Sequence, residues 1–328
     1  MKKIVLSFVY WLPFILISCG INDFTDASGS DPDFRSEMRN FVINISRYAR
    51  SQNPAFAVIP QNGIELVTLN GEDDGELSTD YLNAIDGHGQ EDLFYGYDND
   101  DIATLSSDTG YITAFLNVSR NQGKVILVTD YCYTHSKMDD SYSLNNAEGY
   151  VSFAADERNL NNIPAYPTVP YDVNSFDINS LSDVRNFLYL INPENFVSRA
   201  AFIAAVASTD YDLLIMDLYF SDGTEFSSSE ITQLKEKANG KRWMVICYMS
   251  IGEAEDYRYY WQASWVTNPP SWLCEEDPSW PGNFTVRYWV EDWQNIIFGN
   301  DSSYLKKILD AGFDGVYLDI IDAFEYFE

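Results

Sequence analysis

One stretch of sequence decides the fold: Tyr304-Leu-Lys-Lys-Ile-Leu-Asp-Ala-Gly-Phe-Asp-Gly-Val-Tyr-Leu-Asp319. Its first half has the apolar spacing of an amphipathic helix and stops at Gly312, and its second half is an apolar run that ends in a carboxylate. The same order of helix, short turn and apolar strand occurs three times earlier, at 112–130, 196–217 and 227–250. Strands that are apolar on both faces and separated by helices are typical of a parallel sheet covered on both sides.

Eight candidate strands result when four further apolar segments are added to these. They lie at 56–60, 92–96, 124–130, 150–154, 187–191, 212–217, 243–250 and 314–319. Eight parallel strands close a barrel, so we expect a single α/β domain of the (β/α)8 TIM-barrel type. A helix predicted at 39–49 precedes the first strand and would fill the place of a missing final helix. The alternative is an open doubly wound sheet, whose dinucleotide-binding version is disfavoured because no Gly-x-Gly-x-x-Gly motif follows a strand.

The N-terminal residues predict export. Met1-Lys2-Lys3 is followed by an apolar run from Ile4 to Ile17 that is too short for an ordinary membrane span, which indicates a signal peptide at 1–18. The residues before Cys19 match the lipobox of bacterial lipoproteins, in which this cysteine is acylated. We therefore expect an extracytoplasmic protein of the cell envelope, held to the membrane by a lipid on Cys19; a plain signal peptide is the alternative. Residues 19–36 are rich in Asp, Ser and Gly and predict a flexible tether before a domain at 37–328.

Composition restricts the chemistry. The formal net charge is -30, which excludes binding to nucleic acid through its phosphates. The acidity is either ordinary for a secreted surface or a means of attracting a cationic partner. With only two histidines and no Cys-x-x-Cys pair, neither a multi-histidine metal site nor a zinc cluster is indicated, so we expect no metal and no cofactor. Acid-base chemistry then falls to Asp and Glu.

Polar side chains follow nearly every predicted strand, at the edge where the active site of a parallel barrel lies. Some of these acids would be helix N-caps. Two acids at one rim, one ionised and one protonated, are what cleavage of a glycosidic bond requires. Tyr and Trp residues crowd the segment 257–293, where they either stack on sugars or pack the segment against the barrel.

Specific strings add a resemblance. The strings are Tyr248-Met-Ser-Ile-Gly-Glu-Ala-Glu-Asp-Tyr-Arg258, Trp280-Pro-Gly-Asn283 and Gly312-Phe-Asp-Gly-Val-Tyr-Leu-Asp-Ile-Ile-Asp322. They resemble glycoside hydrolase family 114, the endo-α-1,4-polygalactosaminidases. The strings at 56–63, 85–96 and 128–132 resemble a circularly permuted branch, once labelled as related to cysteinyl-tRNA synthetase, whose members begin with strands that come late in the usual order. The chain departs from the family's pattern in this order and at Gln61-Asn62.

The resemblance implies functional residues. With a permuted order, the eighth strand corresponds to the fourth strand of a conventional barrel and the second to its sixth, and family members carry their catalytic acids there. Carried over, Asp319 is the nucleophile or stabilising carboxylate and Glu91 the general acid/base. Glu91 precedes the strand predicted at 92–96, and a strand at 83–89 would place it better. We expect the substrate-binding residues to be Gln61, Asn62, Asp130, Asp217, Tyr248, Glu253, Glu255, Arg258 and Asp322, although Arg258 could instead hold Glu255 or Asp256 in an ion pair.

Three functions follow from these observations. The first is hydrolysis, outside the cell, of an α-1,4-linked polysaccharide that contains galactosamine and is cationic through its free amines. The second is a glycan-binding lipoprotein that keeps the barrel and has no turnover. The third, an enzyme that activates amino acids, is disfavoured because His88-Gly89 is not a full HIGH motif, no KMSKS motif occurs and the charge is wrong for tRNA.

Overall fold

The computed structural model describes residues 32–328. The predicted signal peptide, the predicted lipid anchor Cys19 and residues 19–31 of the predicted tether lie outside the described residues. The first helix, α1 (Phe34–Gln52), begins inside the predicted tether, and its N-cap Asp33 accepts a hydrogen bond from the backbone N of Ser36. Residues 34–36 therefore belong to α1 and not to a tether. Phe34 is already one of the buried residues of this helix.

The described chain alternates strands and helices. The parallel strands are β1 (Ala57–Pro60), β2 (Gly87–Glu91), β3 (Val125–Tyr131), β4 (Val151–Ala155), β5 (Phe187–Tyr189), β6 (Leu213–Met216), β7 (Met244–Ser250) and β11 (Gly315–Asp319). The other α-helices are α2 (Thr79–Ala84), α3 (Ser106–Asn121), α4 (His135–Glu148), α5 (Arg199–Ala207), α6 (Ser228–Leu234), α7 (Glu291–Ile297) and α8 (Tyr304–Ala311). Short 3-10 helices are η2 (Ile64–Val67), η3 (Leu181–Asp183), η4 (Pro193–Asn195), η5 (Ala263–Val266) and η6 (Ile321–Tyr326).

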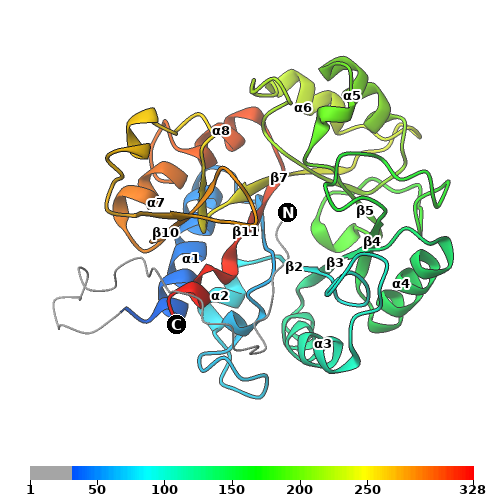
Figure 1. Ribbon diagram of the computed structural model, residues 1–328. Helices are drawn as coiled ribbons and strands as arrows, with labels where there is room; N and C mark the ends of the chain where they lie inside the picture. The colour runs from blue at the N-terminus through cyan, green and yellow to red at the C-terminus, as the bar shows by residue number, and fades with distance from the viewer. Residues whose placement is uncertain (1–31) are drawn as a thin grey trace.

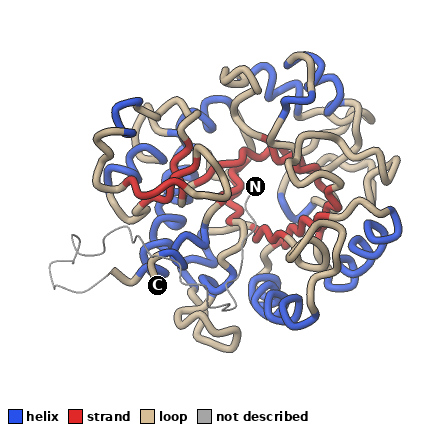
Figure 2. Tube along the Cα trace, viewed as in Figure 1, coloured by secondary structure: helices blue, strands red, loops and turns tan. Residues whose placement is uncertain are grey.

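The parallel strands form two sheets, in the orders β1-β11-β7-β6-β5 and β2-β3-β4. A parallel bridge between Gln61 and Gly89 links β1 to β2, whereas residues 32–328 form no ladder between β4 and β5. Figure 2 shows the strands around a common centre, with helices outside them. The predicted α/β fold with parallel strands is thus confirmed. A third sheet of β8 (Glu253–Glu255), β10 (Asn283–Val286) and β9 (Leu273–Glu276) is antiparallel and lies in the segment between β7 and α8.

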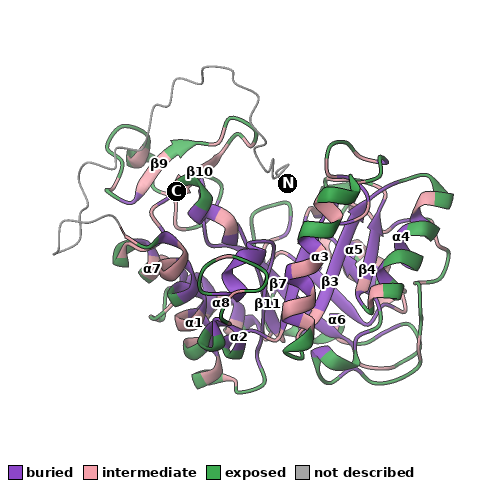
Figure 3. Cartoon of the chain, turned by 90° about the horizontal axis from the view of Figure 1, so that it is seen from below, coloured by how far each residue is buried: buried purple, intermediate pink, exposed green. Residues whose placement is uncertain are grey.

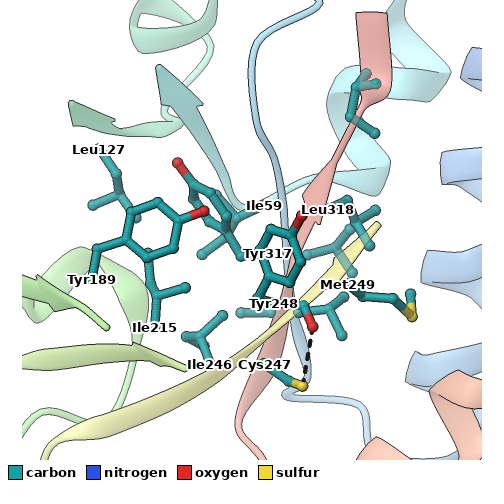
Figure 4. Packing of buried hydrophobic residues seen from close by; sticks show 14 of the residues in the cluster. Ile59, Leu127, Tyr189, Ile215, Ile246, Cys247, Tyr248, Met249, Tyr317 and Leu318 are labelled. Atoms are coloured by element: carbon teal, nitrogen blue, oxygen red, sulfur yellow. Dashed lines mark hydrogen bonds between the residues drawn. The ribbon is translucent and has the colours of Figure 1, made fainter. Parts of the chain in front are cut away.

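Burial explains why these segments are strands. The parallel strands are buried on both faces, while the helices expose one face to solvent (Figure 3). At the centre, Ile59, Leu127, Ile215 and Ile246 pack around the rings of tyrosines from β5 and β11 (Figure 4). Continuous apolar runs were therefore a good guide to most of the strands.

The prediction of a strand at 92–96 is wrong, and the strand is β2. Asp92 has φ +60° and Gly96 φ +115°, and the backbone N atoms of Phe94 and Tyr95 donate to Asp130 Oδ1 at 2.8 and 3.2 Å. Residues 92–96 therefore form a turn. Glu91 becomes the last residue of β2 instead of preceding the strand.

Strand β2 contains two glycines and therefore has no apolar run. A Cβ atom on Gly89 would lie 2.0 Å from the hydroxyl of Tyr317, so only glycine leaves room for this ring. The ring of Tyr317 meets that of Tyr189 at 5.3 Å between centroids (Figure 4). The centre between the parallel strands thus contains tyrosine rings, and β2 carries glycine where the ring of Tyr317 lies.

His88, on β2, has a structural role. Its side chain is fully buried, with Nδ1 3.0 Å from Ser119 Oγ and Nε2 3.0 Å from the backbone O of Asn62. Burial lowers the pKa of His88 to about 4, so the ring is neutral at physiological pH. His88 fixes the backbone of Asn62 beside the candidate site.

The first and last described elements meet in what we call the terminal seam, formed by Phe34, Arg35, Phe327 and Glu328. The rings of Phe34 and Phe327 are 5.4 Å apart, and Arg35 Nε lies 2.9 Å from Glu328 Oε1. Figure 1 shows α1 beside the C-terminus. No helix within residues 32–328 combines the length and the apolar character needed to cross a bilayer.

Candidate active site

Asp319 and Glu91 end two strands that flank β1. Asp319 is the last residue of β11 and Glu91 the last residue of β2, and β1 pairs with β11 and is bridged to β2. Since the strands are parallel, both acids lie at the carboxyl edge, and two strand spacings put their backbones about 10 Å apart. The negative charge of Asp319 is one of the causes that raise the pKa of Glu91. The two acids therefore influence each other across the same rim.

The carboxylate of Glu91 is held by two neutral donors. Gln61 Nε2 donates to Oε2, and Tyr131 Oη donates to Oε1. Gln61 is itself oriented by the hydroxyl of Tyr189, which donates to Gln61 Oε1 at 3.0 Å. Glu91 is 6% exposed, and burial, followed by the charges of Asp92 and Asp319, raises its pKa to about 8. Glu91 is therefore protonated at neutral pH, as a general acid must be.

Asp319 is held by a different arrangement. Tyr248 Oη donates to Oδ2 at 2.6 Å, and the backbone N of Ile320 donates to Oδ1 at 2.9 Å. Ile320 has φ +60°, a conformation that β-branched residues rarely adopt. The chain of Gly252 passes so close that a Cβ atom there would lie 2.2 Å from Ile320 O. Backbone strain beside Asp319 is thus maintained by the surrounding loops, as is common at functional sites.

A cavity of about 300 Å³ opens beside Asp319. It is lined by side chains from the carboxyl ends of β5, β6, β7 and β11 and from the segment that carries β8 and β10: Ile191, Asn192, Asp217, Tyr248, Glu253, Glu255, Tyr257, Arg258, Trp280, Pro281, Asn283, Asp319 and Ile320. Its walls carry four carboxylates and one arginine. The structure therefore brings Asp217, Tyr248, Glu253, Glu255, Arg258 and Asp319 of the predicted site together.

Arg258 forms ion pairs inside this cavity. Its Nε is 2.5 Å from Glu255 Oε2, and its Nη2 is 2.7 Å from Asp217 Oδ2. The arginine thus holds Glu255 and Asp217, and of the two carboxylates considered from the sequence, Glu255 is its partner. Its side chain is 5% exposed, so this network is almost dry.

A second cavity, of about 40 Å³, lies beside Glu91. Asn62, Gln90 and Asp322 are among its lining residues. Asn62 has φ +62°, and its Oδ1 accepts from the backbone N of Glu91 at 3.2 Å. Within the described residues, Asn62 Nδ2 and Gln90 Oε1 have no hydrogen-bond partner although both are buried. These two atoms can bind a polar group beside Glu91.

Two predicted substrate ligands have other positions. Asp130 is fully buried, where it accepts from Ser141 Oγ at 2.6 Å and Asn145 Nδ2 at 3.0 Å besides two backbone N atoms, so its assignment to substrate is corrected to a structural one. Gln61 is 1% exposed and bound to Glu91, so it orients a carboxylate and does not line either cavity. Burial keeps both side chains out of reach of a sugar.

Several residues of the site were missed from the sequence. Tyr131 and Tyr189 contact Glu91 and Gln61, and Arg158 forms an ion pair with Asp92, the residue that follows Glu91. Tyr131 directly follows the strand predicted at 124–130, at the edge where site residues are expected, but it is not a carboxylate. Arg158 lies in an irregular segment after β4, where no local pattern indicates its contacts.

The tryptophans of 257–293 divide between the two expected roles. Trp272 and Trp293 are buried and contact each other at 5.0 Å between ring centroids with their planes tilted by 38°, so they pack this segment into the core. Trp280 lines the large cavity, and its Nε1 has no partner within residues 32–328. Across the same residues, no group of three or more His, Cys, Asp or Glu side chains is arranged to hold a metal ion.

A known protein family matches the C-terminal part of the chain. Residues 193–328 match the glycoside-hydrolase family GH114. The match starts just after β5 and contains Asp319 and the Gly252-to-Arg258 loop. The resemblance to glycoside hydrolase family 114 is therefore confirmed over this part of the chain.

Similar proteins occur in bacteria and archaea. An uncharacterized protein of Methanocaldococcus jannaschii is 44% identical over 156 residues, which are 47% of this chain and 41% of that protein. An uncharacterized protein of Thermotoga maritima is 44% identical over 121 residues, 37% of this chain and 36% of its own length. One of Deinococcus radiodurans is 43% identical over 121 residues, with the same two shares. The chain thus spans less than half the length of the curated relatives that it matches.

Proposed function

We propose that this chain, with its match to family GH114, is a glycoside hydrolase that cleaves an α-1,4-linked, galactosamine-containing polysaccharide by a two-carboxylate mechanism. Asp319 acts as nucleophile or stabilising carboxylate, and Glu91 acts as general acid/base. The observation that carries this proposal is the pair of acids at the ends of β11 and β2, of which Glu91 has a pKa of about 8. Two carboxyl groups that differ in proton affinity across one rim are what glycosidic cleavage needs.

The cavity beside Asp319 supports a cationic polymer as substrate. Its four carboxylates outnumber its single arginine, and a focused negative potential attracts protonated amines. Trp280 adds an aromatic ring for contact with a sugar, and its Nε1 has no hydrogen-bond partner within residues 32–328. Glu253, Glu255 and Asp217 would meet amino or hydroxyl groups, while Tyr248 keeps Asp319 in place. Beside Glu91, Asn62 and Asp322 would bind the neighbouring sugar.

We further propose that the domain is a circularly permuted (β/α)8 barrel. Three observations support this order: the bridge between β1 and β2, the family match that begins after β5, and the terminal seam, which brings residues 34–35 against residues 327–328. A conventional chain would begin near β5 and continue through the seam from η6 into α1. The irregular segment at 156–180 is then the connection that replaces the conventional ends.

The place of action is also a proposal. The apolar run and the lipobox before Cys19 support export and acylation, which would hold the enzyme at the cell envelope. An enzyme tethered there would meet a polysaccharide too large to enter the cell. Metabolic labelling of the expressed protein with a fatty-acid probe, compared with a Cys19→Ser variant, tests the anchor: equal labelling of both would refute it.

The enzymatic proposal is tested by release of reducing ends from partly deacetylated galactosaminogalactan. We expect release by the parent protein and a loss of at least about 100-fold in Asp319→Asn and in Glu91→Gln, the range for positioned acid-base groups. Asp310→Asn is the matched control, because Asp310 lies on the outer face of α8 in an exposed pair with Lys306. Rates that are equal in all four proteins would refute the assignment. Binding of the polymer without any release would instead favour a glycan-binding protein.

A further inference from the structure

Arg158 contacts two neighbours of Glu91, the carboxylate of Asp92 and the ring of Tyr131. Its Nη2 lies 2.7 Å from Asp92 Oδ1 and also donates to the backbone O of Gly96 at 2.9 Å, while Nε lies 2.5 Å from Asp100 Oδ1. Its Cζ lies 3.8 Å from the centroid of the Tyr131 ring. The arginine side chain is 12% exposed, so these contacts form with little water around them.

Asp92 and Tyr131 both lie next to Glu91. The hydroxyl of Tyr131 donates a hydrogen bond to Glu91 Oε1, and Asp92 is the residue that follows Glu91 in the chain. Asp92 has φ +60°, and a Cβ atom on Gly96 would lie 2.1 Å from Asp92 Oδ1. The turn therefore leaves the Asp92 carboxylate one narrow position, where it is enclosed and points at the guanidinium.

We propose that Arg158 is the positioning residue for the general acid: it clamps Tyr131 and neutralises Asp92, so that the proton of this pair of carboxyls resides on Glu91. The inference deepens the proposed function and rests on the role given there to Glu91. No motif and no family string contains Arg158, which lies between β4 and β5.

Charge explains why an arginine is needed. Burial raises the pKa of Asp92 to about 6, and the hydrogen bond and charge of Arg158 oppose that rise. Without the arginine, the adjacent buried carboxyls of Glu91 and Asp92 would compete for one proton. The proton would then reside on Asp92 in part of the molecules, and those molecules would lack the general acid. The groups that face Glu91 from the packed elements are Asp92, Tyr131, Arg158, Tyr189, Tyr317 and Asp319. Arg158 is the cation among them.

Geometry explains why lysine would not suffice. A guanidinium presents parallel N–H donors and a flat face, so that it can bind a carboxylate through two donors and stack on a ring together. An ammonium group would keep the charge near Asp92 and lose the contact with the Tyr131 ring. Arg158→Lys therefore separates the charge from the clamp.

The test uses the full chain with Arg158→Lys, Arg158→Gln and Asp92→Asn, and follows kcat and KM against pH on the same polysaccharide. We expect kcat to fall about 10-fold for lysine and about 100-fold for glutamine, with KM changed less than about twofold, because the acid is impaired and not the binding of sugar. The alkaline limb is the fall of kcat at high pH, where Glu91 loses its proton. Loss of the positive charge in Arg158→Gln moves this limb to higher pH by about one unit, whereas loss of the negative charge in Asp92→Asn moves it to lower pH.

Opposite movements of one limb are a result that general damage to the fold would not give. Arg199→Lys and Arg199→Gln serve as matched controls, since Arg199 pairs with Glu230 and lies 5.0 Å from the Phe226 ring on the outer helices. We expect their limbs to be unchanged. An unchanged kcat in both Arg158 variants, or limbs that move in the same direction in Arg158→Gln and Asp92→Asn, would overturn the proposal.

Failure of this inference is distinguishable from failure of the proposed function. If Glu91→Gln is inactive while the Arg158 variants behave as the parent, Glu91 keeps its role and only the clamp is refuted. If Glu91→Gln keeps full activity, both are refuted. If Arg158→Gln does not fold, the milder Arg158→Lys and Asp92→Asn variants still decide, because they leave a charged or isosteric side chain in place.

Discussion

The two sides of the candidate site hold their carboxylates in opposite ways. On the Asp319 side, a cavity of about 300 Å³ is lined by four carboxylates, one arginine and one tryptophan, among other residues. On the Glu91 side, a cavity of about 40 Å³ adjoins an acid whose own hydrogen bonds come from neutral donors. The Asp319 side is wide and rich in charge, whereas the Glu91 side is narrow and favours the protonated form of its acid.

This difference teaches how one rim can perform acid and base chemistry together. Two carboxyl groups with the same intrinsic proton affinity need unlike surroundings before they can take unlike roles. Asp319 accepts one hydrogen bond from a phenol and one from a backbone N–H, an arrangement suited to an anion. Glu91 is buried near two further carboxylates, which favours its neutral form.

The pH dependence of the reaction is the strongest test of the proposed difference between Glu91 and Asp319. A general acid must carry its proton, and the pKa of Glu91 is about 8. We expect kcat/KM to be constant below that pH on this limb and to fall about tenfold per pH unit above it, or about 100-fold by pH 10. In Glu91→Gln the remaining rate should lack this limb. Circular dichroism over the same range serves as a control for unfolding, and an unchanged limb in the variant would show that another group titrates.

The ion-pair network on the Asp319 side gives the next largest effect. Arg258→Met leaves Glu255 and Asp217 buried without their cation, and breaking such a pair typically costs about 3–5 kcal/mol in the free energy of unfolding. Arg50→Met is the control, because Arg50 pairs with Asp86 at the surface, where a loss of about 0–1 kcal/mol is expected. Urea unfolding at pH 7 measures both. Equal losses in the two variants would mean that the network is as solvated as the surface.

The hydroxyl of Tyr248 sharpens the comparison with a smaller change. Tyr248→Phe removes the 2.6 Å hydrogen bond to Asp319 and leaves the ring in place. A hydrogen bond to a charged group contributes about 1.5–3 kcal/mol, which corresponds to a loss of roughly 10- to 100-fold in kcat. Steady-state kinetics at pH 6, where Glu91 stays protonated, isolates this effect. A variant with the parent kcat would show that Asp319 needs no support from the phenol.

The sequence predicted the Asp319 side better than the Glu91 side for a physical reason. Strand β11 is an apolar run that ends in its acid, and the string from Tyr248 to Arg258 carries local signals for a loop rich in charge. Strand β2 reads Gly-His-Gly-Gln-Glu, because its glycines make room for the ring of Tyr317, and apolar periodicity does not register such a strand. Glu91 was therefore found through resemblance, while its strand was misplaced.

Contacts between distant segments account for what remained unpredicted. Asp130 is the last residue of the strand predicted at 124–130, where a catalytic acid would lie, and only the folded chain reveals that Ser141 and Asn145 donate hydrogen bonds to it. Arg158 reaches Tyr131 and Asp92 from an irregular segment, so no spacing in the sequence indicates the contact. Residue types and strand ends can be predicted from a pattern, whereas the partner of a buried charge depends on tertiary packing.

The pairing of β1 with β11 has a consequence for biosynthesis. β1 is made long before its ladder partner β11, so one edge of an apolar strand stays unpaired while the residues between them are synthesised. Closure of such a distant ladder is slow, and an open edge invites pairing with other nascent chains. The distance in sequence between β1 and β11 therefore lengthens the time during which this edge is open to other chains.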